Sequence, residues 1–177
     1  MRPSRNAIVG AAFALFALYS NTASATGGSA ALLLGNGFKD GYSVGIGARG
    51  GFTLPMSIYL GGTFVYHLGR SEGDDKLNAL YFGAEGGYEL NAGPLTVRPY
   101  LGIGYANASV TRPGYCRGTV CPAPTSANEG KGAFWPGATA IFPIGNLFVG
   151  ADARYVVVLD AEDSNAFSLF ATGGLTF

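Results

Sequence analysis

Charged side chains are scarce in this 177-residue chain, at 12% of all residues, and neither sign is in excess. No basic patch is present, so nucleic acid is not expected as a partner. The chain has one histidine and two cysteines, which is a poor ligand set for a metal, and no cofactor is expected. No apolar run reaches 18 residues, which argues against a helical membrane span.

The first 25 residues have the features of a cleaved signal peptide. Arg2 and Arg5 form a basic start, and residues 7–19 form an uncharged apolar run. Ala23-Ser24-Ala25 then gives the small-x-small pattern of a cleavage site. A membrane-anchor helix is the alternative, but the run is shorter than the roughly 20 residues that a spanning helix needs. The sequence therefore predicts a signal peptide over 1–25 and one exported domain over 26–177.

The last twelve residues alternate between an apolar and a smaller, more polar set. One set is Phe167, Leu169, Ala171, Gly173, Leu175 and Phe177; the other is Ser168, Phe170, Thr172, Gly174 and Thr176. Neighbouring side chains of a strand point to opposite faces, so the segment predicts a strand with one apolar face. About ten such residues are enough for a tilted strand to cross a bilayer.

Turn signals divide the exported domain into eight strands. They are expected at 29–37, 42–53, 57–68, 77–90, 95–109, 133–143, 147–158 and 166–177. Short turns near Leu54-Pro55-Met56, Asn91-Ala92-Gly93 and Ile144-Gly145-Asn146 alternate with longer polar connections, the longest at 111–132. The first strand is the weakest of the eight, because Ala30-Ala31-Leu32-Leu33-Leu34 does not alternate.

The alternation places the mid-strand charges on one face and the apolar side chains on the other. In the strand at 42–53, for example, Tyr42, Val44, Ile46, Ala48 and Phe52 are expected to face outward. The charges of the opposite face are Arg49, Glu85, Glu89, Arg98, Asp152 and Arg154. Glycines share that face and leave room for long side chains. A soluble sandwich would be the reverse arrangement, and the signal peptide and alternating turn lengths favour the barrel.

The exported domain resembles the small OmpA/OmpX-like outer-membrane β-barrel proteins. The resemblance is carried by Gly174-Leu175-Thr176-Phe177 and by the strands around 83–88 and 97–105. It implies an eight-stranded antiparallel up-and-down transmembrane β-barrel after a cleaved signal peptide. It also implies an outer-membrane location, contact with outer-membrane lipid, and a terminal aromatic, Phe177 with Leu175, that is read by the barrel-assembly machinery. The chain ends at the barrel, so attachment to the cell wall is not implied.

Three smaller sequence patterns give little indication of function. Residues 45–50 match G-x-G-x-x-G, but no helix follows, so inward glycines of a strand explain them better than a dinucleotide site. Cys116 and Cys121 lie in the longest connection of an exported protein and are expected to form a disulfide. His67 is expected to be a hydrogen-bonded rim residue; it lacks the neighbouring serine of the lipid A deacylase type.

Arg98 is expected to lie opposite Gly87 and to contact Glu85 or Glu89. Asp152 and Arg154 would face this pair, with Arg49 in the same layer. Three arginines against three carboxylates give a neutral, filled lumen, while a narrow charge-lined channel is the alternative. The sequence thus favours a non-enzymatic, monomeric surface protein that binds an unknown extracellular ligand through its loops. A narrow porin or a lipid-modifying enzyme is the rival.

Overall fold

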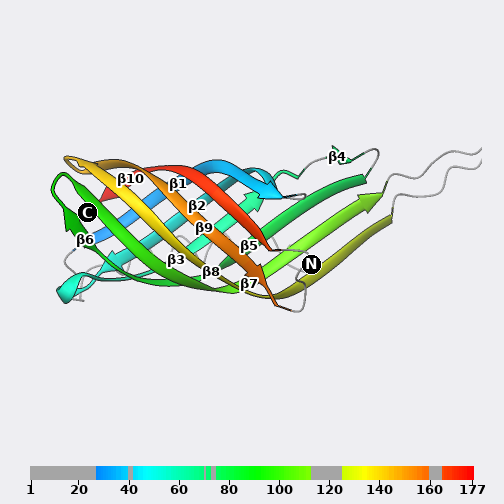
Figure 1. Ribbon diagram of the computed structural model, residues 1–177, viewed down its shortest axis with the longest axis horizontal. Helices are drawn as coiled ribbons and strands as arrows, with labels where there is room; N and C mark the ends of the chain where they lie inside the picture. Colours follow the sequence, from blue (N-terminus) through cyan, green and yellow to red (C-terminus); the bar gives the residue numbers. More distant parts are fainter. Residues whose placement is uncertain (1–26, 40–41, 70, 73–74, 113–124, 160–164) are drawn as a thin grey trace, which may run out of the picture.

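The computed structural model describes residues 27–39, 42–69, 71–72, 75–112, 125–159 and 165–177. Figure 1 shows that these residues form a closed, tilted β-barrel. Among them, no helix has the length and the apolar character to cross a membrane. The predicted signal peptide and both cysteines lie outside the described residues, so their predicted roles stay predictions.

Eight long strands make up the wall of the barrel. They are β1 (Gly27–Lys39), β2 (Tyr42–Thr53), β3 (Ile58–His67), β5 (Asp75–Tyr88), β7 (Leu95–Arg112), β8 (Thr125–Ile144), β9 (Leu147–Val158) and β10 (Ala166–Thr176). Two short strands, β4 (Ser71–Glu72) and β6 (Leu90–Ala92), extend the ladders of β5 and β7. A 3₁₀ turn, η1 (Pro55–Ser57), joins β2 to β3.

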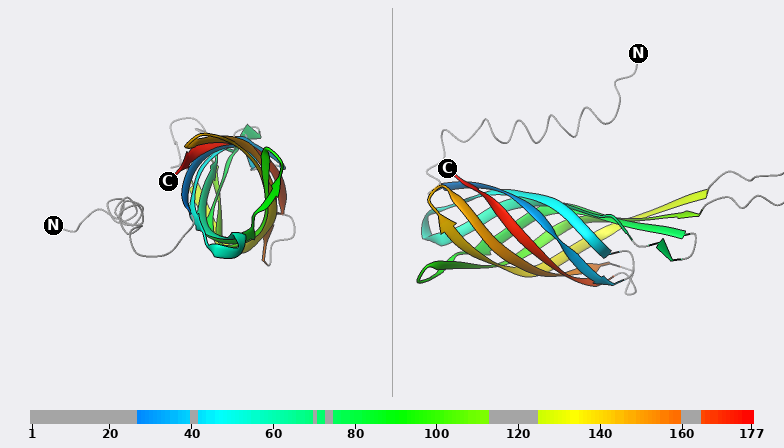
Figure 2. Two further views of the ribbon diagram at one scale, coloured as in Figure 1. Left: turned by 90° about the vertical axis from the view of Figure 1, so that its left-hand side faces the viewer. Right: turned by 90° about the horizontal axis from the view of Figure 1, so that it is seen from above.

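Each long strand pairs antiparallel with the next long strand along the chain. The ladder between β1 and β10 then closes the ring, with Ser29 opposite Thr176 and Gly37 opposite Ser168. The view along the axis in Figure 2 shows the closed ring. The predicted eight-stranded, antiparallel, up-and-down barrel is confirmed.

Apolar side chains cover the outside of the barrel and charged side chains lie inside, the reverse of the distribution in a soluble protein. Large apolar side chains such as Leu101, Ile103 and Leu175 are exposed on the outside, while Arg154 and Asp152 are buried inside. The first strand follows the same rule although its sequence does not alternate: Leu32 and Leu34 point outward, and Leu33 is buried. Its sequence hides the alternation because the inward side chains at this level are apolar too.

Tyr42 is the exception to the predicted phasing. The sequence predicts that it faces outward, but only 6% of it is exposed, and it belongs to the buried cluster inside the barrel. The β1–β2 ladder shifts register between Asn36 and Lys39, next to the Lys39–Tyr42 pair. This irregularity lets the ring turn over the end of the lumen, where it contacts His67 edge to face at 5.0 Å.

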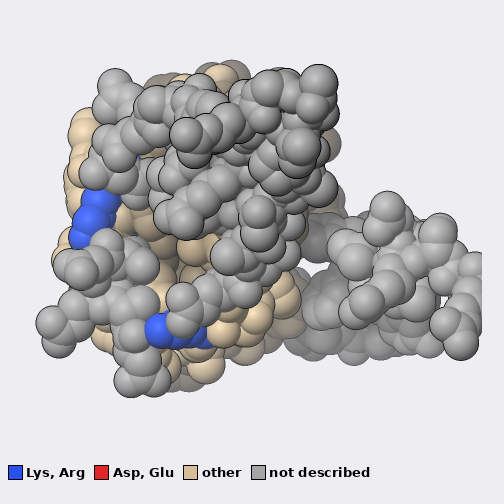
Figure 3. All heavy atoms as spheres, turned by 90° about the vertical axis from the view of Figure 1, so that its right-hand side faces the viewer, with Lys and Arg blue, Asp and Glu red and all other residues tan. Residues whose placement is uncertain are grey.

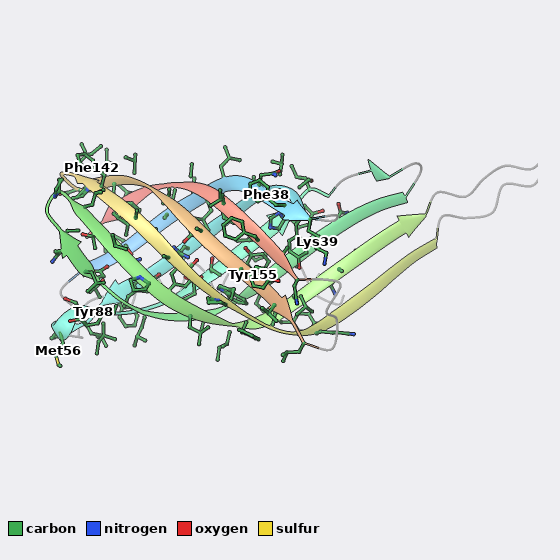
Figure 4. All side chains as sticks on the ribbon, viewed as in Figure 1. Phe38, Lys39, Met56, Tyr88, Phe142 and Tyr155 are labelled. Carbon is green, nitrogen blue, oxygen red and sulfur yellow. The ribbon has the colours of Figure 1, made fainter. Side chains whose placement is uncertain are left out.

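Exposed aromatic side chains gather near both ends of the apolar exterior. Tyr88, Phe142 and Met56 lie toward the same end in Figure 4, and Phe38 lies toward the other end. Phe38 stacks on Phe167 outside the wall, with ring centroids 5.9 Å apart. Aromatic girdles at the two interfaces are typical of barrels that sit in a bilayer.

The two ends of the barrel differ in the length of their connections. Tight turns at 54–57, 93–94 and 145–146 lie at the end where β10 finishes, which corresponds to the periplasmic end. The opposite, outward end departs from the prediction. The described parts of the connection predicted over 111–132, at 111–112 and 125–132, are strand, because the β7–β8 ladder continues to the Arg112–Thr125 pair. β5, β7 and β8 therefore project past the rest of the wall (Figure 2).

Candidate functional site in the barrel lumen

The middle of the lumen holds a cluster of two arginines and two carboxylates. Arg49 comes from β2, Glu85 from β5, and Asp152 and Arg154 from β9. All four occupy inward phases of their strands, and none is more than 5% exposed. We call this set the central cluster. Four of the six charged residues predicted to share the lumen are thus brought together.

Arg49 spans the lumen and binds both carboxylates of the central cluster. Its Nε lies 2.7 Å from Glu85 Oε2, and its Nη2 donates to Glu85 Oε1 at 3.2 Å. Its Nη1 lies 2.8 Å from Asp152 Oδ2 and donates to Thr139 Oγ1 at 2.7 Å. The side chain joins β2, β5 and β9 across the interior, so it ties opposite walls of the barrel together.

Arg154 supplies the second positive charge. Its Nε donates to Asp152 Oδ1 at 2.7 Å, and its Nη1 lies 3.6 Å from Glu85 Oε1. Nη1 also donates to Thr63 Oγ1 at 3.4 Å. Two charges of each sign therefore alternate around the cluster. A buried charge needs such partners, because burial without them would cost several kcal/mol.

Neutral side chains complete the hydrogen bonds of the carboxylates. Tyr100 Oη donates to both oxygens of Asp152 at 3.0 and 2.9 Å, and Thr139 Oγ1 donates to Oδ2 at 2.6 Å. Trp135 Nε1 donates to Glu85 Oε1 at 2.9 Å. The sequence reasoning did not name these three residues. Phasing of β8 would have found two of them, because Trp135 and Thr139 share the strand face of the inward position 137.

Glycines create the space that the large inward side chains fill. A Cβ at Gly102 would lie 1.9 Å from Trp135 Nε1, and a Cβ at Gly137 would lie 2.5 Å from Tyr100 Oη. Neither ring could occupy its present position beside an alanine. The predicted role of inward glycines agrees with this geometry.

Arg98 and Glu89 form a separate pair nearer the periplasmic end. Arg98 Nε donates to Glu89 Oε1 at 3.1 Å, and Nη2 binds the same oxygen. The guanidinium carbon lies 3.8 Å from the centre of the Tyr59 ring. Thr53 Oγ1 adds a hydrogen bond to Glu89 at 3.0 Å. Of the two predicted partners of Arg98, the structure therefore selects Glu89.

The predicted position of Arg98 opposite Gly87 was wrong. The hairpin turns at Gly93 and Pro94, with Ala92 paired to Leu95, so Gly87 lies opposite Tyr100. Gly93 has φ of +66°, a left-handed value that glycine adopts without strain. Placing the turn one residue later moves the partner of Arg98 by two residues. The pair and the central cluster consequently form two layers instead of the single layer predicted.

The Arg98–Glu89 pair lines an open recess at the periplasmic mouth. The recess has a volume of about 420 Å³, and Ser29, Thr53 and Thr176 contribute to its wall. The Glu89 side chain is 20% exposed, in contrast to 0% for Glu85 and Asp152. Solvent thus reaches the lower layer and not the central cluster.

His67 lies deeper than the rim position predicted for it. It is fully buried, and its Nδ1 lies 3.0 Å from the backbone oxygen of Ser43. Tyr42, Tyr81 and Phe170 surround the imidazole at centroid distances of 5.0, 6.0 and 5.9 Å. Tyr42 covers it from the outward end, which is why a residue at a strand end is sealed inside the barrel.

The predicted assembly signal lies on the outer surface of the closing seam. Leu175 and Phe177 are exposed. Phe177 exchanges two backbone hydrogen bonds with Gly28, at 2.6 and 3.0 Å, and a Cβ at Gly28 would lie 2.4 Å from the Phe177 ring. Recognition of these residues by the assembly machinery stays a prediction.

The charged residues of 26–177 fall into two groups by their position in the sequence. Six are the inward residues of the two layers. The remaining fourteen fall, by sequence, within the connections predicted for the outward end: Lys39, Asp40, Arg70, Glu72, Asp74, Asp75, Lys76, Arg112, Arg117, Glu129, Lys131, Asp160, Glu162 and Asp163. Figure 3 shows the outward end, where basic side chains are visible among the described residues. The sequence thus gives the apolar band no charge, and the two groups have separate environments.

The ion pairs in the lumen cross-link strands of the wall. Within the described ranges, no three His, Cys, Asp or Glu side chains gather as metal ligands. Both layers are neutral, with each arginine paired to at least one carboxylate. Such a network joins strands from different sides of the closed wall.

Comparisons with solved structures find the same architecture. The chain resembles Ail, the attachment invasion locus protein of Yersinia pestis, at 16% identity and a TM-score of 0.57, over 85% of this chain and 98% of that one. It resembles the N-terminal β-barrel domain of Pseudomonas aeruginosa OprF at 14% identity and 0.57, over 86% and 98%. A major outer membrane protein of Thermus thermophilus gives 11% and 0.64, over 85% and 99%. No protein-family model matches, and neither does any curated protein.

The fold is therefore that of the small OmpA/OmpX-like outer-membrane β-barrels. The apolar exterior, the aromatic side chains near both ends and the polar interior agree with a position in the outer membrane. The outward end of the barrel is the surface-exposed part.

Proposed function

We propose that this chain is a non-enzymatic surface protein whose outward segments bind a partner outside the cell. The observation that carries the proposal is the extension formed by β5, β7 and β8. Ser109 of β7 pairs with Asn78 of β5 on one side and with Asn128 of β8 on the other. The β7–β8 ladder continues from there to the Arg112–Thr125 pair, beyond the level where the other strands end. A sheet of this kind holds a binding surface away from the membrane.

One edge of the extension is available for strand pairing. The β8–β9 ladder begins at the Ala133–Val158 pair, and Leu159 adds a backbone hydrogen bond to Gly132. From Thr125 to Gly130, no described residue of β9 pairs with β8. An open edge presents unpaired backbone groups, and partner proteins often add a strand to such an edge.

The charge of the outward segments indicates which partners they disfavour. Eight acidic and six basic residues give these segments a slight negative excess. A neighbour in structure, Ail, was crystallised with the heparin analogue sucrose octasulfate. We expect no tight binding of a polysulfate by this chain, because like charges repel. A protein or a neutral glycan suits the outward segments better.

The test removes the extension and leaves the barrel intact. Residues 108–129 are replaced by Asn-Gly, which connects β7 to β8 by a two-residue turn of the type hairpins favour. We expect the variant to keep heat-modifiable gel migration and to lose binding of cells that expose the partner. A matched control replaces residues 160–164 with a Gly-Ser segment of equal length. Unchanged binding by the variant without the extension would contradict the proposal.

Two rival functions have distinct readouts. A narrow porin would give steady conductance in planar bilayers, and its conductance would change in Arg98→Ala or Arg49→Ala. A lipid-modifying enzyme would alter the mass spectrum of lipid A, and His67→Ala would abolish the change. The central cluster argues against the first, and the complete burial of His67 argues against the second.

We also propose that the barrel acts as a monomer. The wall closes on itself through β1 and β10, so no second copy is required to complete the sheet. Cross-linking in detergent should give the mass of one chain. A stable dimer would contradict this part of the proposal.

A further inference from the structure

The recess at the periplasmic mouth is a concave polar site at the opposite end from the outward binding surface. Its volume is about 420 Å³, and its wall comes from the start of β1, the turn η1 and the end of β10. Arg98 and Glu89 are the charged residues of this wall. A recess of this volume with a few converging polar groups has the usual form of a site for a small ligand.

The carboxylate of Glu89 has one oxygen available to such a ligand. Arg98 Nε, Arg98 Nη2 and Thr53 Oγ1 all donate to Oε1. No described residue donates a hydrogen bond to Oε2, and this oxygen is not among the buried atoms without a partner. Because the side chain is 20% exposed, solvent in the recess reaches Oε2. A carboxylate oxygen only accepts hydrogen bonds, so the recess offers a negatively charged acceptor.

Arg98 is less available than Glu89. Its Nε and Nη2 are bound to Glu89, and its guanidinium carbon lies 3.8 Å from the centre of the Tyr59 ring. The Arg98 side chain is 7% exposed. A cation can approach Oε2 while Arg98 stays on Oε1, and solvent screens the two positive charges from each other. A single carboxylate is a poor site for a divalent metal, which prefers several oxygen ligands. The recess therefore favours an organic cation.

The turn η1 gives an independent indication that this wall binds something. Met56 and Ser57 have φ of 72° and 64°, which are left-handed values in two consecutive residues that are not glycine. A two-residue turn of this kind suits Asn-Gly, and other side chains are strained there. Met56 is 81% exposed at the periplasmic end of the barrel in Figure 4. An Asn-Gly turn would lack the Ser57 hydroxyl and the Met56 side chain, and both residues line the recess.

The remaining lining matches an ammonium group on a short hydrocarbon chain. The hydroxyls of Ser29 and Ser57 can accept hydrogen bonds, and Leu54 and Met56 supply apolar surface. A primary ammonium group carries three N–H donors. One donor can bind Glu89 Oε2 and the others can bind hydroxyl oxygens, while the methylene groups contact the apolar side chains.

We propose that the recess is a binding site for a primary ammonium group on a short aliphatic chain. Glu89 supplies the charge, and the turn η1 supplies a hydroxyl and an apolar wall. Two sources share this chemistry: a free amine in the periplasm, and the α-amino group that the predicted cleavage after Ala25 would create on Thr26. In the sequence, Thr26 directly precedes Gly27, which lines the recess. The site does not depend on the function proposed for the outward segments.

The direct test is a titration of the barrel of residues 26–177, labelled with ¹⁵N and refolded in detergent micelles. The probe is n-butylammonium, and the amide shifts of Ser57 and Glu89 report binding. Tetramethylammonium has the charge without N–H donors, and butyrate has the opposite charge. We expect saturable shifts with n-butylammonium, weaker shifts with tetramethylammonium and none with butyrate. Shifts with butyrate in place of n-butylammonium would overturn the proposal.

Acetylation of the α-amino group before refolding distinguishes the two sources. If the α-amino group occupies the recess, n-butylammonium binds only to the acetylated barrel. In that case the α-amino group of the unmodified barrel also reacts with acetic anhydride more slowly than that of Glu89→Gln. If the site takes a free amine, both barrels bind n-butylammonium with the same Kd. The absence of saturable binding in both barrels would overturn the proposal.

Variants separate a binding role from a structural one. Glu89→Gln keeps the shape but removes the charge, so the Kd of the acetylated barrel should rise about tenfold, the effect of one charge-assisted hydrogen bond. Met56→Asn with Ser57→Gly should raise the urea midpoint of unfolding and yet weaken binding, because it relieves the turn and removes two lining side chains. Glu129→Gln, the same exchange in the outward part of β8, is the matched control and should bind as the parent does. An unchanged Kd in Glu89→Gln would overturn the proposal.

Discussion

The central cluster and the Arg98–Glu89 pair join the same kinds of charge in one lumen, but their surroundings differ. Glu85 is sealed from solvent and receives bonds from Arg49 and Trp135. Glu89 lies beside an open recess and receives bonds from Arg98 and Thr53. The difference teaches that burial and the number of partners, rather than the type of ion pair, decide how much the barrel depends on each layer.

Loss of Glu85 should have the largest effect. Glu85→Ala removes a carboxylate that neutralises Arg49 and leaves the Trp135 indole without an acceptor. We expect the free energy of unfolding to fall by about 3–5 kcal/mol, since a buried charge is left without its partner. Urea titration of the barrel in lipid vesicles, followed by circular dichroism, measures the change. A loss below about 1 kcal/mol would mean that water reaches the central cluster.

Filling the space behind Trp135 should have the next largest effect. Gly102→Ala places a Cβ 1.9 Å from the indole nitrogen, so the ring must move away from Glu85. We expect a loss of about 1–3 kcal/mol. Trp135 is the sole tryptophan, so its emission maximum should shift as well. Gly86→Ala is the control, because its Cβ meets only Leu60 at 3.9 Å, and it should leave emission unchanged.

Loss of Glu89 should cost much less than loss of Glu85. The two are the same residue type on adjoining parts of one hairpin, which makes Glu89→Ala a matched comparison. We expect a loss of about 1 kcal/mol, because water in the recess can solvate Arg98. The same urea titration applies. Equal losses for the two variants would remove the distinction between the layers.

The smallest expected effect is the coupling energy between Arg98 and Glu89. A double-mutant cycle of Arg98→Ala with Glu89→Ala should give about 0.5–1 kcal/mol, while the cycle with Glu85→Ala should give nearly zero. Arg98 binds Glu89, whereas Glu85 is served by Arg49, Arg154 and Trp135. Substantial coupling between Arg98 and Glu85 would show that the layers act as one network.

The wall of the barrel could be predicted from the sequence better than the contacts inside it. Alternation depends only on the two-residue period of a strand, so it placed Arg49, Glu85, Asp152 and Arg154 inward. The partner of Arg98 depends on where one turn is centred, and the shift to Gly93 and Pro94 changed it. The sequence around Gly93 and Pro94 does not fix the centre of the turn to within one residue.

Two further features depend on tertiary context. The extension of β7 and β8 has the polar composition of a loop, and a sheet that projects into solvent needs no apolar face to mark it as strand. Trp135 could be recognised as inward from the period of β8, but its bond to Glu85 depends on the barrel bringing β8 and β5 together.

The ladder between β1 and β10 differs from the other ladders in how it must form during folding. Every other long ladder joins two long strands that follow each other along the chain, whereas the seam pairs Ser29 with Thr176. Hairpins can therefore form from local contacts, and the entropy of closing a long loop is concentrated in one step. The backbone hydrogen bonds between Gly28 and Phe177 belong to this closing ladder and can form only when the first and last strands meet. The closure of the barrel can thus be followed by one distance, the separation between β1 and β10.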